Sequence, residues 1–191
     1  MSKVKEHEIE NSIRKILEYI GENPDREGLS ETPKRVVKAF KEYFSGYNQN
    51  HHEILGKTFT ETAGYSDMIA LTNLRVQSHC EHHIAPITGQ AIVAYIPKNA
   101  VVGISKISRL VSMYSHRLQL QERLTKQILD AIDEVLTPYG TAVYISASHS
   151  CLSKRGICDD EAMVQTFAFS GDFLNSQLDY KQRFIALTQR V

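Results

Sequence analysis

The sequence predicts an α+β fold, in which strands and helices form separate runs behind a helical N-terminal segment. Four segments are rich in β-branched residues or alternate apolar with polar residues, as strands do. Two segments with apolar residues at helical spacing lie between the second strand and the third. The resulting order of strand, strand, helix, helix, strand, strand is typical of α+β proteins. The expected strands are 68–76, 90–96, 141–147 and 164–169, and a last helix is expected over 180–188.

Two helices are expected at the N-terminus. Isoleucines recur at helical spacing from Ile9 to Ile20, and Gly21 stands where a left-handed C-terminal cap is favoured. Thr32 followed by Pro33 predicts the start of the second helix, because threonine is a good N-cap and proline suits the first helical position.

A polar stretch over 46–62 predicts a connector, and we place a domain boundary at its end. The chain then divides into a helical segment with its connector, 1–62, and a second domain, 63–191. In that domain Ser105 is the expected N-cap of the first helix, and the second helix runs over about 119–136. The residues that these two helices are expected to bury are Ile107, Leu110, Val111, Tyr114, Leu124, Ile128, Ile132 and Val135.

The composition excludes a general affinity for nucleic acid or membranes. Lysine plus arginine and aspartate plus glutamate both number 22, so the formal net charge is zero and no overall basic field attracts polyanions. No apolar run approaches the roughly 20 residues of a membrane-spanning helix, and no signal peptide begins the chain. Three cysteines, an odd number, fit a reduced compartment. We therefore expect a soluble, cytoplasmic protein whose clustered cysteines and histidines bind metal.

Cysteine and histidine are spaced as metal ligands. Cys80 and His83 have the Cys-x-x-His separation that a tight loop brings onto one tetrahedral ion, and Cys151 is the expected third ligand. Two sulfurs and one nitrogen favour zinc, and three protein ligands leave one position for water. His149 precedes Cys151 by two residues in an expected strand, so both side chains should leave one face. Because imidazole transfers protons near neutral pH, His149 and His82 are candidate acid and base groups.

The same residue types also build closed structural zinc sites. Four protein ligands would leave no position for water, and cysteine also occurs as a small buried hydrophobe. The spacing alone leaves these interpretations open. The residues from which a closed site would draw are Cys80, His82, His83, His149, Cys151 and Cys158.

Several basic residues are candidates for binding an anion. Lys106 and Arg109 lie just inside an expected helix, where backbone N–H groups and the helix dipole favour negative charge. Arg155 follows the last metal-ligand candidate closely, and Arg35 with Lys38 forms a basic pair on the second helix. Taken singly, each is ordinarily a solvated surface charge.

Glu122 allows two interpretations. Taken alone, it is an exposed helix residue that pairs with Lys126 at i,i+4. A carboxylate can also accept hydrogen bonds from the N1–H and 2-amino groups of guanine, which adenine cannot supply.

From about residue 10 to its end, the sequence resembles the GTP cyclohydrolase I family. Several separated motifs in one order are far more specific than a lone Cys-x-x-His. The matching motifs include Glu31-Thr32-Pro33-Lys34-Arg35-Val36, Cys80-Glu81-His82-His83, Gly103-Ile104-Ser105-Lys106-Ile107-Ser108-Arg109, Gln121-Glu122-Arg123-Leu124-Thr125, His149-Ser150-Cys151 and Arg155-Gly156.

The resemblance implies a tunnelling fold, with an antiparallel sheet and two long helices on one side of it. In this fold the sheets of several subunits close into a barrel, usually a homodecamer of two pentamers with active sites at subunit interfaces. The implied reaction converts GTP and water into 7,8-dihydroneopterin triphosphate and formate, the first step toward folate and other pterin cofactors.

The resemblance also implies roles for individual residues. The zinc ligands would be Cys80, His83 and Cys151. Guanine would be anchored by Glu122 with Gln121 nearby, and the triphosphate would be surrounded by Lys106, Arg109, Arg155, Arg35 and Lys38. Proton transfer would fall to His82 and His149, and Ser105 would assist the ribose rearrangement.

Departures from the family pattern concern fine geometry. Leu118 stands where the family often has proline, His79 precedes the cysteine, and residues 162–167 replace a run rich in serine and threonine. We expect four other histidines to lie at the surface and Cys158 to be a spare thiol; these histidines are His51, His52, His79 and His116. Two other functions stay open. One is a binding module with structural zinc, and the other is a related tunnelling-fold enzyme, such as a nitrile reductase or a cyclohydrolase that stops at a partial product.

Overall fold

The computed structural model describes residues 4–60 and 64–189. The chain forms two compact units, of which the first ends at Ser45 and the second begins at Gly46. The boundary expected between residues 62 and 63 lies outside the described residues and stays a prediction. No helix within 4–60 or 64–189 is long and apolar enough to cross a membrane.

The first unit consists of helices α1, Glu6–Tyr19, and α2, Thr32–Tyr43, as expected. Gly21 has a φ of 91°, which confirms the left-handed residue after α1. The N-cap prediction for α2 is wrong by one residue, because Glu31 precedes the helix and Thr32 is its first residue. Ile20 is 64% exposed, so the apolar stripe of α1 is not buried along its whole length in this chain.

A mixed sheet forms the centre of the second unit. Among the described residues it has five strands in the order β5-β2-β3-β6-β7, and its four long strands are antiparallel to their neighbours. The short β5 instead pairs in parallel with the end of β2. The strands are β2 Ile69–Cys80, β3 Pro86–Ile96, β5 Leu118–Gln119, β6 Gly140–His149 and β7 Val164–Phe169. All four expected strands are confirmed, and three of them extend beyond the expected ranges.

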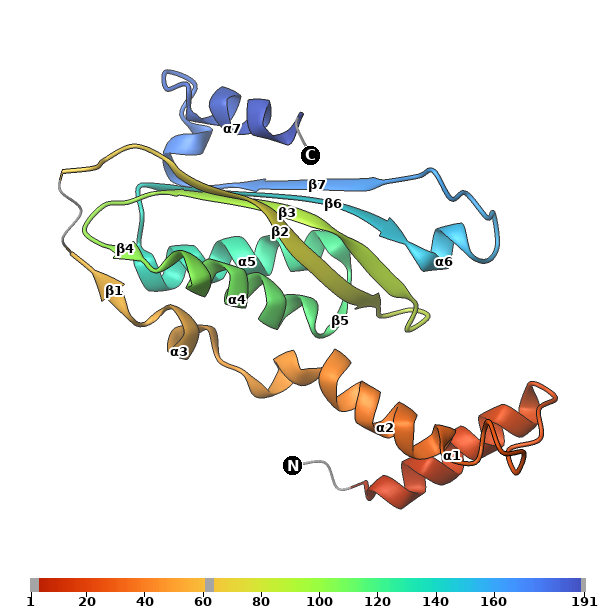
Figure 1. Ribbon diagram of the computed structural model, residues 1–191. Helices are drawn as coiled ribbons and strands as arrows, with labels where there is room; N and C mark the ends of the chain where they lie inside the picture. The colour runs from red at the N-terminus through yellow and green to blue at the C-terminus, as the bar shows by residue number, and fades with distance from the viewer. Residues whose placement is uncertain (1–3, 61–63, 190–191) are drawn as a thin grey trace. The chain divides into compact units, whose positions relative to one another are not determined.

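Two long helices cover one face of this sheet, α4 from Ile104–Ser115 and α5 from Gln121–Leu136 (Figure 1). The C-terminal helix α7, Tyr180–Thr188, lies on the other face, within the expected range. The N-cap of α4 is Gly103, so Ser105 lies in the first turn and the prediction for it is wrong.

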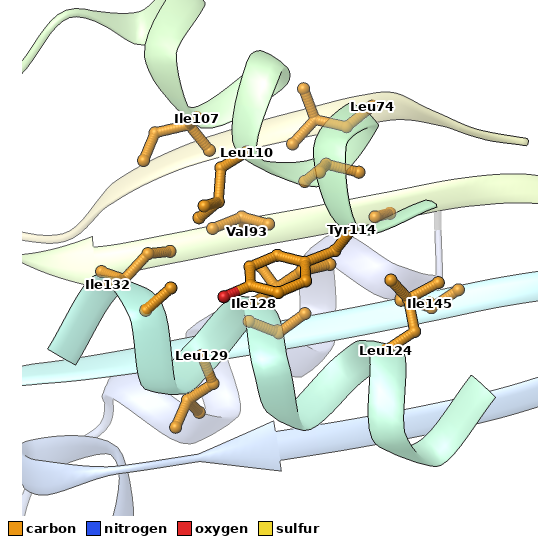
Figure 2. Close-up of a cluster of buried hydrophobic side chains, with 14 of the residues drawn as sticks. Leu74, Val93, Ile107, Leu110, Tyr114, Leu124, Ile128, Leu129, Ile132 and Ile145 are labelled. Carbon is orange, nitrogen blue, oxygen red and sulfur yellow. The ribbon is translucent and has the colours of Figure 1, made fainter. Parts of the chain in front are cut away.

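Residues Ala91–Ile96 of β3 are buried on both faces of the sheet. Val93 and Tyr95 belong to the core between the sheet and the helices α4 and α5. Ile92 and Ala94 belong to the core on the other face, which includes Phe184 of α7. Figure 2 shows the larger core, where side chains from the two helices meet those of the strands. The expected core residues of α4 and α5 are buried, except that Val135 is only partly buried. This covered, rigid sheet positions the loops at its ends.

The expected connector is more ordered than its composition suggests. It contains a 3₁₀ turn, Ser45–Asn48, the helix α3, His51–Leu55, and β1, Thr58–Phe59, which pairs with β4, Val101–Val102. Leu55 is fully buried, and α3 packs against α4 and α5. A single helical turn with two apolar residues, Ile54 and Leu55, is too short to be recognised by periodicity.

Candidate metal centre and active site

The hairpin between β2 and β3 carries the Cys-x-x-His motif on a tight loop, as expected. Cys80 N–H donates to the carbonyl oxygen of Ala85 at 2.8 Å, and Ile84 N–H donates to that of Cys80 at 2.8 Å. Ile84 has a φ of 54°, in the left-handed region that such a turn requires. An ion pair between Glu81 and Arg123 of α5 ties the loop to the helix, a contact that the motif does not predict.

The structure brings Cys80, His83 and Cys151 together. Their ligand atoms all lie within 4.8 Å of one another, and Cys80 Sγ lies 3.9 Å from His83 Nδ1. In a tetrahedral zinc site, bond lengths of about 2.0–2.3 Å place neighbouring sulfur and nitrogen ligands about 3.6 Å apart. Within the described part of the chain, this group includes neither His149 nor Cys158. The arrangement therefore fits an ion with three protein ligands and one open position.

Cys151 does not lie in a strand. Strand β6 ends at His149, and Cys151 lies in the short helix α6, Ser150–Ser153. The prediction that His149 and Cys151 share one strand face is therefore wrong, because the chain turns into a helix directly after His149.

The donor set also fits a cation chemically. Burial raises the pKa of the Cys151 thiol above its usual value, and the neighbouring Cys80 raises it further, while the charge of Arg155 acts in the opposite direction. Two thiols at such close range do not readily ionise together unless a positive charge compensates them. Zinc binds thiolates and supplies that charge. Free cysteines so placed are thus suited to hold a divalent metal.

His149 is oriented by Gln121. Its Nε2 lies 2.8 Å from Gln121 Oε1. The amide nitrogen of Gln121 donates to the carbonyl oxygens of Ile145 and Val164, at 3.1 and 2.8 Å, and to Thr166 Oγ1 at 3.2 Å. Because carbonyl oxygens only accept, the amide oxygen must face the histidine, and Nε2 of His149 must donate. Neutral His149 therefore carries its proton on Nε2 and keeps Nδ1 free to accept one.

Burial lowers the pKa of His149 below its usual value, and the negative charge of Glu122 only partly opposes this shift. His149 is consequently neutral at pH 7 and able to act as a base. Glu122 is exposed at the start of α5, next to the buried Gln121. The expected pair between Glu122 and Lys126 is not formed, because Lys126 pairs with Asp130 instead.

Two more predicted site residues lie beside the metal group. Nδ1 of the exposed His82 is 3.9 Å from Cys80 Sγ. Arg155 Nη1 lies 3.1 Å from Nε2 of His83, so its guanidinium is close to the metal ligands. Cys158 is exposed, which agrees with a spare thiol, whereas His79 lies partly buried in β2 and not in a solvated loop.

The remaining predicted site residues lie elsewhere in the chain. Ser105, Lys106 and Arg109 are on the first turns of α4, which follows the end of β3 that is opposite to the hairpin (Figure 1). The nine residues that separate Ile87 from Ile96 along β3 correspond to about 30 Å. The two other candidates, Arg35 and Lys38, are exposed on α2 in the other compact unit.

Comparisons with known proteins place these features in one family. A family model described as GTP cyclohydrolase I matches residues 9–189. The chain is 49% identical over 189 residues to "GTP cyclohydrolase 1" of Maricaulis maris, covering 99% of this chain and 92% of the relative. It is 50% identical over 183 residues to the protein of that name from Pelagibacter ubique, covering 96% of this chain and 90% of the relative. A crystal structure of the apo archaeosine synthase QueF-Like is 23% identical with a TM-score of 0.46, and the match covers 56% of this chain and 96% of that chain.

Proposed function

The chain belongs to the GTP cyclohydrolase I family, and we propose that it converts GTP and water into 7,8-dihydroneopterin triphosphate and formate with the help of zinc. The observation that carries this proposal is the group of Cys80, His83 and Cys151, with an oriented, neutral His149 two residues from one of its members. A closed structural site would need a fourth protein ligand, and the described residues supply three.

Cys80, His83 and Cys151 would hold the zinc ion. Zinc with three protein ligands lowers the pKa of a water molecule in its open position to roughly 7, which provides a nucleophile for hydrolysis at neutral pH. The hairpin and α6 hold the three donors from separate elements, and the sheet between them is rigidly packed.

Glu122 would select guanine, because its exposed carboxylate can accept hydrogen bonds from both N1–H and the 2-amino group. Gln121 is buried and its polar atoms are engaged by His149 and the strands. We therefore assign Gln121 chiefly to positioning His149, next to the guanine that Glu122 would bind.

Nδ1 of His149 would accept a proton during opening of the imidazole ring of guanine, and its raised acidity as an imidazolium would let it return the proton. His82, exposed beside Cys80, would serve as the second group that transfers protons. Ser105 would assist the later ribose rearrangement.

The triphosphate site would be completed by neighbouring subunits. Arg155 lies at the metal group, but Lys106, Arg109 and Ser105 follow the far end of β3 in the same chain. One chain alone therefore does not gather the full set, and a homo-oligomer in which adjacent copies share sites brings them together. We propose the barrel-shaped decamer for this assembly, with Arg35 and Lys38 also facing the phosphates.

The product would enter folate or pterin synthesis in the cytoplasm. The decisive experiment is incubation of the purified, zinc-loaded protein with GTP, followed by mass spectrometry of the product and measurement of formate. Equal amounts of dihydroneopterin triphosphate and formate are expected. Formate with a ring-opened or cyclic-phosphate product would instead support a partial cyclohydrolase, and no turnover by the zinc-loaded oligomer would contradict the proposal.

A chelator separates this enzyme from a binding module with structural zinc. Apart from Cys80 and the adjoining Cys151, both hydrophobic cores consist of side chains that are not zinc ligands, so removal of zinc should abolish turnover while helical content and subunit assembly remain. Readdition of Zn²⁺ should restore turnover. Unfolding on chelation would favour the structural role.

A further inference from the structure

A second group of metal-ligand side chains lies on α3 and α5. His51 and His52 begin α3, and Glu134 lies near the end of α5. Their ligand atoms all lie within 4.8 Å of one another. Thirteen residues of helix, about 20 Å, separate Glu134 from Gln121 at the catalytic end of α5. The expectation that both histidines lie in a polar connector at the surface is only partly right, since His51 is half-buried.

We propose that His51, His52 and Glu134 bind a divalent transition-metal ion, with Zn²⁺ as the representative ligand. His51 Nε2 lies 3.2 Å from Glu134 Oε2, and His52 Nε2 lies 3.2 Å from Glu134 Oε1. Neighbouring nitrogen and oxygen ligands of tetrahedral zinc are about 3.3 Å apart. Both distances between histidine and carboxylate thus match a coordination sphere, and two imidazoles with a carboxylate form a donor set that zinc accepts.

The two histidines are held in an unusual arrangement. Adjacent residues on a helix normally point in different directions. Here the ring centroids of His51 and His52 are 4.3 Å apart with an interplanar angle of 34°, and both rings reach the same carboxylate. The side chain of Asn50 accepts a hydrogen bond from His52 N–H at 2.9 Å and thereby caps the helix. The pair is therefore presented from an ordered first turn and not from a loose loop.

Tyr114 supports the ligand role of His51. Its hydroxyl oxygen lies 3.2 Å from His51 Nδ1, and its side chain is buried under α3. When Nε2 of a histidine binds metal, Nδ1 carries the proton and needs an acceptor, which the phenol oxygen provides. Such partners orient the imidazole, and their loss commonly weakens metal affinity by about 10–100-fold.

The proposal is tested by counting zinc. The full-length oligomer is equilibrated with buffered free Zn²⁺, and bound zinc per subunit is measured by mass spectrometry. We expect two equivalents in the wild type, and one in both His52→Ala and Glu134→Gln. Glu53→Gln removes the same charge from the exposed side of α3 and should keep two, so it is the matched control. Tyr114→Phe should weaken the second equivalent about 10–100-fold and leave the first unchanged.

Cobalt provides an independent readout. The first Co²⁺ equivalent should give sulfur-to-metal charge-transfer absorption from the two cysteines, whereas the second should add none, because its ligands are nitrogen and oxygen. Three results would each overturn the proposal. They are one bound zinc per subunit in the wild type at saturating Zn²⁺, two bound zinc ions in both His52→Ala and Glu134→Gln, or loss of the second zinc ion from Glu53→Gln. Formate release is measured separately, so failure of the proposed reaction does not affect this count.

Discussion

The hydrogen bond between His149 Nε2 and Gln121 Oε1, 2.8 Å long, sets the protonation pattern of the candidate active site. The amide nitrogen of Gln121 donates to two strand carbonyl oxygens, and these hydrogen bonds prevent the amide group from flipping its nitrogen and oxygen. A buried glutamine thus selects the tautomer of a histidine that lies 28 residues further along the chain.

Replacing Gln121 by methionine should lower kcat by at least about 10-fold and leave KM for GTP within a few-fold of wild type. Methionine has a similar length but its thioether accepts a hydrogen bond from His149 Nε2 only weakly, so the imidazole loses its preferred tautomer and orientation. Steady-state kinetics of formate release measure both constants. If KM rises strongly at unchanged kcat, Gln121 instead contacts guanine directly.

Replacing His149 by alanine should abolish most turnover while the protein keeps its catalytic zinc. Loss of an acid–base group typically costs about 10²–10⁴-fold in rate, and His149 is not among the grouped metal-ligand donors. Zinc content and formate release are measured on the same sample. His116→Ala is the control, since this histidine contacts Ser112 at the end of α4. Loss of zinc from the His149 variant would show that His149 is itself a ligand.

Most of the fold could be predicted from the sequence, because its elements have strong local patterns. The strand Val164–Phe169 and the helix Tyr180–Thr188 have the expected bounds. The errors concern features that local patterns do not record. The single turn of α3 has only two apolar residues and is too short to show a period. The helix α6 begins at Ser150, where the alternating pattern alone predicts that the strand continues.

The candidate site likewise has features that the sequence predicts and contacts that it does not. The Cys-x-x-His spacing predicts one end of the metal group, because a short loop limits how far its residues can separate. The hydrogen bond between Gln121 and Thr166 joins residues that are 45 positions apart in the sequence. The contact between His51 and Glu134 joins residues that are 83 positions apart. Only the tertiary structure brings such pairs together, and neither has a spacing signal in the sequence.

Mixing two inactive variants should restore activity if neighbouring subunits share sites. Lys106→Ala lacks a phosphate-binding group and His149→Ala lacks the base, and these residues lie toward opposite ends of the sheet in one chain. Co-expression of the two variants should produce mixed oligomers in which some sites have both residues intact. Formate release should then exceed that of either variant alone by about 10-fold or more, given the loss that each causes. Activity no higher than that of the separate variants would place both residues in a site within one subunit.

Asp67→Asn should destabilise the protein more at pH 7 than at pH 3. Arg183 of α7 donates to both carboxylate oxygens of Asp67, at 3.0 and 2.8 Å, and together with the N–H of Met68 it holds the pKa of Asp67 below its usual value. For a carboxyl group with a lowered folded-state pKa, the stabilisation is present above the unfolded pKa of about 3.9 and is lost as pH falls through the folded value.

The side chains of this pair are 40% and 45% exposed, so solvent screening limits the effect at pH 7 to roughly 0.2–1 kcal/mol. Denaturant unfolding at one fixed protein concentration measures it, with wild type and variant compared at both pH values. Arg183→Met should show the same pH dependence, since it removes the other partner. A difference that persists undiminished at pH 3 would mean that Asp67 stabilises the fold through its hydrogen bond to Met68 N–H, which asparagine weakens, and not through its charge.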